Sequence, residues 1–192
     1  MLDVNAAMLQ TEDDVMRGTA EDRDVGAARG TKLKEPNFYA LPFACQMIVW
    51  AIRKRLDVLR GRQIDRDEVL KVFHLANWSA FYGALLDAVD VLVHYRRDQD
   101  LVLHAQHCPC LAPYEAYLIN ALAHLQNGEG EAALLSLCEI VTPTGARLTV
   151  TELRVIASGL QEQNLECAYI DLSAVRHRAM LSNLSPKGQR CH

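Results

Sequence analysis

The sequence has no apolar run long enough to cross a membrane. Its longest run, from Phe38 to Ile52, has 15 residues and is interrupted by Gln46, whereas a spanning helix needs about 20. The chain also begins without the basic start and apolar stretch of a secretory signal. We therefore interpret the run as part of a buried helix, and we expect a cytoplasmic protein that does not enter the membrane.

Enzyme and nucleotide-binding motifs are absent as well. The chain contains no Gly-x-Ser-x-Gly, no P-loop and no Gly-x-Gly-x-x-Gly. The formal net charge of −4 gives no overall positive field of the kind that attracts nucleic acid. These absences disfavour an enzyme and a nucleic-acid partner, and they leave an active site of unrecognised type as a remote alternative.

Six cysteines could indicate a disulfide framework, but the chain is long enough to bury its own core without one. Cys45 and Cys138 lie in apolar helical patterns, where cysteine acts as a small hydrophobic residue. We expect thiols in a reducing compartment.

The composition divides the chain into three parts. Residues 1–35 hold eight acidic and five basic residues and no aromatic one, so they bury too little apolar surface to offset their ordering entropy. We expect a disordered acidic tail over 1–35, a single helical domain over 36–184 and a flexible C-terminus over 185–192.

Helical periodicity dominates the central part. It predicts helices at 38–59, 66–75, 77–96, 113–126 and 130–141, one that begins at Thr149, and a weaker one at 171–182. A short strand is predicted at 101–104. We therefore expect an all-α fold, a compact bundle of six to seven helices with at most a minor strand.

Some positions within these helices can be predicted. Helix 38–59 is apolar nearly all round in its first half, which indicates a central position. Trp50 and Phe81 lie on apolar stripes and are predicted to be buried. Thr149 and Glu152 have the spacing of a capping box.

The most unusual segment is His104-Ala105-Gln106-His107-Cys108-Pro109-Cys110. Two imidazoles and two thiols within seven residues offer the ligands that zinc prefers. The interpretation we favour is a structural connector in which Pro109 sets the turn and the thiols pack on the core. Reactive thiols are a weaker alternative.

A metal site at this cluster would use His104, Cys108 and Cys110, completed by the distant His94 or His74. Zinc is the first candidate ion. Haem bound through Cys108 is less favoured, because a Cys-Pro dipeptide alone discriminates poorly.

Two further patterns suggest local roles. Asp90 and His94 are four residues apart on a predicted helix and can pair. The stretch 148–160 resembles the first helix of LuxR-type helix-turn-helix domains, which would place DNA binding within 148–180. However, the residues that follow lack a clear recognition helix.

His104, the Cys108-Pro109-Cys110-Leu111 element and Glu115 at the start of a Leu-rich helix resemble a family of uncharacterised helical proteobacterial proteins. The resemblance covers roughly residues 38–165. It implies an all-α fold and a bacterial origin, and it carries no known activity.

Together these observations favour a non-enzymatic regulatory or protein-interaction domain with a protein partner or self-association. The first alternative is a metal- or haem-responsive protein that uses residues 104–110. The second is a DNA-binding regulator that uses 148–180.

Overall fold

The structure is a computed structural model that describes residues 32–33, 37–62, 66–97, 104 and 108–175. Within these residues the chain forms six complete α-helices, two short 3-10 helices, two short strands and a helical stretch at 172–175, where the described residues end. The α-helices are α1 (Phe43–Leu59), α2 (Arg66–Leu75), α3 (Tyr82–Tyr95), α4 (Pro113–Gln126), α5 (Gly130–Cys138) and α6 (Pro143–Glu162). The predicted all-α fold is confirmed, and no described helix is long and apolar enough to cross a membrane.

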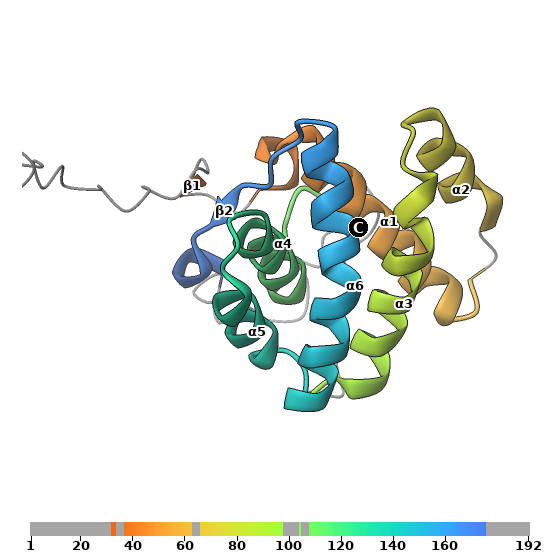
Figure 1. The fold of residues 1–192 in the computed structure, drawn as a ribbon. Helices are drawn as coiled ribbons and strands as arrows, with labels where there is room; N and C mark the ends of the chain where they lie inside the picture. Colours follow the sequence, from red (N-terminus) through yellow and green to blue (C-terminus); the bar gives the residue numbers. More distant parts are fainter. Residues whose placement is uncertain (1–31, 34–36, 63–65, 98–103, 105–107, 176–192) are drawn as a thin grey trace, which may run out of the picture.

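Helix α6 lies in the middle of the bundle, with α3 on one side and α4 and α5 on the other (Figure 1). Its inner side buries Leu153, Ile156 and Leu160, all at most 2% exposed. This is the stripe that helical periodicity predicts for this segment.

The start of α6 differs from the prediction. Thr142 caps the helix by accepting a hydrogen bond from the backbone N–H of Gly145, and Pro143 occupies the first turn. Proline is favoured there because its missing N–H has no helical partner. Thr149 is fully buried within the helix, so the predicted capping box at Thr149 is wrong.

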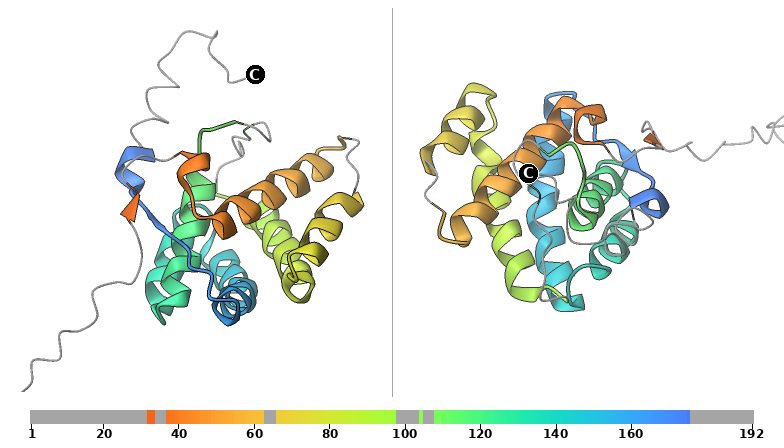
Figure 2. Two further views of the ribbon diagram at one scale, coloured as in Figure 1. Left: turned by 90° about the horizontal axis from the view of Figure 1, so that it is seen from above. Right: turned by 180° about the vertical axis from the view of Figure 1, so that it is seen from behind.

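The predicted helix 38–59 is divided into two parts and is not central. Pro42 separates η1 (Phe38–Ala40) from α1. In the view from behind, α1 runs across the outside of the bundle in front of α6 (Figure 2). Phe43 is therefore 63% exposed, and Trp50, which we expected to be buried, is only partly so.

The most completely buried helix is α4 instead. Ten consecutive residues of this helix, 114–123, are buried. The sequence predicted an inward stripe for this helix, but α4 is covered on all sides because α5, α6 and β2 pack around it.

An aromatic cluster of Phe73, Phe81 and Tyr82 joins α2 to the start of α3. Phe73 and Phe81 are buried and lie with ring centroids 6.0 Å apart, which confirms the burial predicted for Phe81. The break that the sequence indicated near residue 77 is present: Asn77 has a φ of 59° and separates α2 from η2 (Ser79–Phe81).

The chain then returns along α4. Strand β2 (Tyr169–Ile170) pairs in parallel with β1 (Lys32–Leu33), so two residues of the predicted tail form a strand. Asn120 holds β2 with its side-chain amide, which donates to the carbonyl of Ile170 and accepts from its N–H. Residues 172–175 are helical; the rest of the predicted 171–182 helix, and all of the predicted strand except His104, lie outside the described residues.

Gly159 allows α6 to approach Phe81. A Cβ at this position would lie 2.6 Å from the Phe81 ring. Gly159→Ala should therefore lower the free energy of unfolding by about 1–3 kcal/mol in urea titrations, even though alanine is the better helix former. Gly83→Ala is the control, because nothing lies within 4 Å of its added Cβ. If both variants are as stable as the wild type, the predicted contact is absent.

Candidate functional site: the Cys108–Cys110 segment and the Arg53–Glu115 ion pair

The Cys-Pro-Cys element lies against the beginning of the folded domain. The backbone N–H of Phe38 donates to the carbonyl of Pro109 at 2.7 Å, and Asn37 forms an antiparallel bridge with Cys110. Cys108 is buried, whereas Cys110 is half-buried. The segment is thus an integral part of the domain, consistent with the connector that we favoured.

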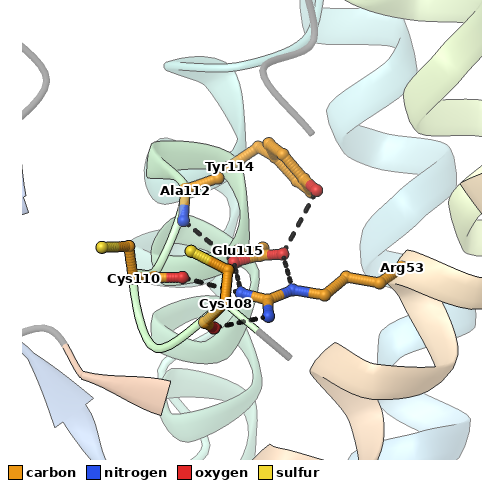
Figure 3. A network of polar contacts seen from close by, with 6 residues as sticks. All are labelled: Arg53, Cys108, Cys110, Ala112, Tyr114 and Glu115. Atoms are coloured by element: carbon orange, nitrogen blue, oxygen red, sulfur yellow. Dashed lines mark hydrogen bonds and ion pairs between the residues drawn. The ribbon is translucent and has the colours of Figure 1, made fainter. Parts of the chain in front are cut away.

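The buried side chain of Arg53 in α1 holds this segment through hydrogen bonds. Its Nε donates to Oε1 of Glu115 at 2.7 Å, and its Nη2 donates to Oε2 at 2.9 Å. The same guanidinium donates to two backbone carbonyls, from Nη1 to Cys108 at 2.9 Å and from Nη2 to Cys110 at 2.8 Å. Figure 3 shows the guanidinium between the carboxylate and the two carbonyls. We call this group of contacts the Arg53 clamp.

Glu115 receives further hydrogen bonds within α4. The N–H of Ala112 donates to Oε2 at 2.9 Å, and the hydroxyl of Tyr114 donates to Oε1 at 3.2 Å. Each carboxylate oxygen therefore has two donors. Because Glu115 is in the first turn of α4, its charge also interacts favourably with the helix dipole.

The ion pair is shielded from water. The side chains of Arg53 and Glu115 are both 0% exposed, and the ring of Phe38 lies 5.1 Å from the guanidinium carbon. Burial alone would lower the pKa of Arg53, but the hydrogen bonds and charge of Glu115 outweigh it and raise this pKa. Burial, followed by the charge of Glu115, raises the pKa of Tyr114 well above its usual value.

The charges of the clamp also act on His104. Burial lowers the pKa of its imidazole, the charge of Glu115 opposes this, and the charge of Arg53 adds to it. A lowered pKa favours the neutral imidazole, which is the form that binds metals.

The predicted metal ligands are only partly placed together. Cys108 and Cys110 both contact Arg53 through their backbone carbonyls, and the charges of Arg53 and Glu115 act on the pKa of His104. In the described part of the chain, no group of three or more His, Cys, Asp or Glu side chains is arranged to hold a metal ion. His107 lies outside that part. The metal site therefore stays a prediction.

The other histidines of the hypothesis are on different elements. His94 packs its ring against Tyr95, and His74 lies 3.4 Å from the hydroxyl of Ser79. Asp90, which we considered as a partner of His94, binds Arg55 through both carboxylate oxygens at 3.0 and 2.6 Å.

The region proposed for DNA binding has a different local structure. After α6 the chain reverses at Asn164, which has a φ of 56°. The segment 165–168 is irregular and leads into β2. The described residues up to 171 therefore do not form the second helix of a helix-turn-helix.

Comparisons with known proteins give no relative. No family model, curated protein or solved structure matches the chain.

Arg53 is a residue of this site that the sequence pattern did not indicate. Its charge has a local explanation in the basic end of the first predicted helix, where cations interact favourably with the helix dipole. The spacing held a usable signal, because Arg53 follows Cys45 and Val49 at intervals of four and so lies on the same buried side. Its partner could not be identified, since 62 residues separate Arg53 from Glu115.

Breaking the clamp should destabilise the fold strongly. Glu115→Ala leaves a buried guanidinium without its counter-charge, which costs about 3–5 kcal/mol. Asp90→Ala is the control, because it removes a bidentate pair with Arg55 whose side chains are 25% and 45% exposed, and such pairs contribute about 0–1 kcal/mol. Urea unfolding measures both. A loss of under 1 kcal/mol for Glu115→Ala would contradict the structural role of the clamp.

The metal prediction is tested by elemental analysis of untagged protein. Stoichiometric zinc or iron, lost in both Cys108→Ser and Cys110→Ser, would establish the site. The connector interpretation predicts no such metal, and no change in melting temperature with a chelator.

Proposed function

We propose that this protein is a non-enzymatic interaction domain that self-associates through the outer side of η1 and α1. The observation that carries the proposal is the exposure of large apolar side chains there. Tyr39 is 59% exposed and Phe43 is 63% exposed, and they continue into the half-buried Met47 and Trp50. We call these four residues the α1 stripe.

The spacing of the three stripe residues in α1 places them on one side of the helix. Phe43, Met47 and Trp50 are separated by four and three residues, so their side chains are neighbours on the helix surface. The solvent side of a surface helix is normally polar, but residues 37–52 contain no Asp, Glu, Lys, Arg or His. An exposed apolar surface of this kind supports a role in binding another protein.

The distribution of charge favours a second copy of the chain as the partner. The stripe is uncharged, so two copies meet without repulsion between like charges. The basic residues that follow the stripe, Arg53, Lys54, Arg55 and Arg62, are each paired with a carboxylate of the same chain. A two-fold contact between the first halves of two α1 helices therefore meets no strong repulsion from them.

The stripe is held in place before any partner binds. The Arg53 clamp ties α1 to α4, and the ammonium of Lys54 lies 5.7 Å from the centroid of the Trp50 ring. The ring of Phe43 also packs against the ring of the buried Trp78, with the two ring centroids 6.2 Å apart. A preorganised surface loses less conformational freedom on association.

Sedimentation velocity of the full chain tests the proposal over roughly 1–100 µM, where weak and moderate dimers dissociate. The wild type should form a dimer. Phe43→Asp should weaken this dimer at least about tenfold, because it places a charge at the centre of the apolar contact. The variant should still fold, since an acidic residue in the first turn of α1 interacts favourably with the helix dipole.

Leu135→Asp is the matched control, because Leu135 is 69% exposed on α5 and does not belong to the stripe. It should leave the dimer unchanged, and circular dichroism should show that both variants fold. A wild type that is monomeric throughout the range would overturn the proposal. If Phe43→Asp and Leu135→Asp weaken the dimer equally, the dimer contact does not depend on the α1 stripe, and the proposal is wrong.

A further inference from the structure

Three polar side chains from three elements meet at the end of α4. His124 lies in the last turn of α4, Glu129 immediately precedes α5, and Tyr169 belongs to β2. Nδ1 of His124 lies 2.6 Å from Oε2 of Glu129. The hydroxyl oxygen of Tyr169 lies 3.2 Å from the same Oε2 and 3.4 Å from Nδ1. We call these three residues the His124 cluster.

The turn between α4 and α5 brings Glu129 back to His124. The backbone N–H of Glu129 donates to the carbonyl of His124 at 2.8 Å. Gly128, which precedes Glu129, has a φ of 77°, a left-handed conformation that glycine adopts without strain. The backbone of the turn therefore places the carboxylate beside the imidazole.

Tyr169 is placed by β2, which lies beside α4 (Figure 1). Asn120 holds the neighbouring Ile170 through two side-chain hydrogen bonds. The ring of Tyr169 packs edge-on against the ring of His124, with the centroids 5.0 Å apart. The amide of Asn127 donates to the hydroxyl oxygen of Tyr169 at 3.0 Å. The three donor atoms are thus held together before any ligand binds, which lowers the entropic cost of binding.

The cluster is accessible from solvent. The side chains of His124 and Glu129 are 24% and 44% exposed, and Tyr169 is half-buried. The hydrogen bond from His124 lowers the pKa of Glu129, so its carboxylate is ionised at neutral pH. A cation from solution therefore reaches a negatively charged oxygen without any opening of the core.

We propose that the His124 cluster binds a divalent transition-metal ion, with zinc as the first candidate. The donors are Nδ1 of His124, a carboxylate oxygen of Glu129 and the hydroxyl oxygen of Tyr169. The imidazole nitrogen favours zinc over magnesium and calcium, which prefer oxygen ligands. The fourth position of the ion faces solvent and takes a water. The site is separate from the α1 stripe and from the 104–110 segment.

The distances between the donor atoms suit such an ion. The ligands of a tetrahedral ion with bonds of about 2.1 Å lie about 3.4 Å apart. The two distances that involve Tyr169, 3.2 and 3.4 Å, are close to this value. The third, 2.6 Å, is shorter because Nδ1 and Oε2 share a proton.

An ion that replaces the shared proton requires Glu129 to move away by about 0.8 Å, which its exposed side chain allows. A neutral imidazole then carries its proton on Nε2. Only His124 and Glu129 belong to the four residue types that most often bind zinc, and the phenol oxygen of Tyr169 supplies the third donor.

Isothermal titration of the untagged full chain with zinc chloride, after treatment with a chelator, tests the inference. Three partly exposed ligands hold an ion less tightly than a closed four-ligand site, so protein purified without added zinc should carry little of it. One zinc per chain should then bind with micromolar affinity. A wild type that binds no zinc up to roughly 100 µM would overturn the proposal.

Three variants each remove one donor. His124→Ala, Glu129→Gln and Tyr169→Phe should each weaken zinc binding at least about tenfold, and Tyr169→Phe keeps the packing of the ring. Glu68→Gln is the matched control, because the side chain of Glu68 is also 44% exposed and forms an ion pair, with Lys54. It should bind zinc like the wild type. Circular dichroism without zinc should show that all four variants fold.

A further variant separates this site from the cysteine segment. Cys108→Ser should keep the zinc of the His124 cluster. Zinc binding that is lost in Cys108→Ser and kept in Glu129→Gln would overturn the proposal.

The melting temperature provides a second readout. Zinc at about 100 times its Kd should raise the melting temperature of the wild type by about 5–10 °C, because the ion binds only the folded chain. The same zinc concentration should leave the melting temperature of Glu129→Gln nearly unchanged. An equal rise in both proteins would place the zinc at another site and contradict the inference.

Discussion

The Arg53–Glu115 ion pair connects the parts of this fold that are distant in sequence. A buried guanidinium must be matched by a counter-charge and by acceptors for its remaining N–H groups. Here the counter-charge comes from the first turn of α4 and the acceptors from the carbonyls of Cys108 and Cys110. One side chain therefore sets the position of α1, the start of α4 and the connector before it.

This constraint explains why the Cys-Pro-Cys element has a defined shape without regular secondary structure. Its carbonyls are directed at Arg53, and its middle residue accepts a backbone hydrogen bond from Phe38. The element is therefore held by directed hydrogen bonds rather than by the burial of a large apolar area. Its carbonyls must point at the guanidinium, because leaving a buried charge without partners is costly.

The same constraint separates the two sides of α1. The inner side carries Arg53 and the buried apolar residues, and the outer side carries the α1 stripe. A helix held firmly on one side can present apolar residues on the other without refolding around them. The proposed self-association depends on this asymmetry.

Local patterns in the sequence determined most helices and several of their ends. The helices at 66–75 and 113–126 lie where periodicity and proline chemistry predict them, because these signals act within a few residues. The start of α6 was missed because Pro143 is equally compatible with the end of one helix and the first turn of the next.

Only the tertiary structure decided which helix is central and which charge is buried. Periodicity indicates that a helix has an apolar side, but not how many neighbours cover it. The sequence therefore predicted a central helix at 38–59 and only an inward stripe for α4, whereas α4 is buried around its whole circumference. Likewise, Arg53 and Glu115 each had a sufficient local explanation, in the basic end of a helix and in a helix dipole. Their pairing across 62 residues follows from the packing of α1 against the start of α4, and a charge is buried only where the fold supplies its partner.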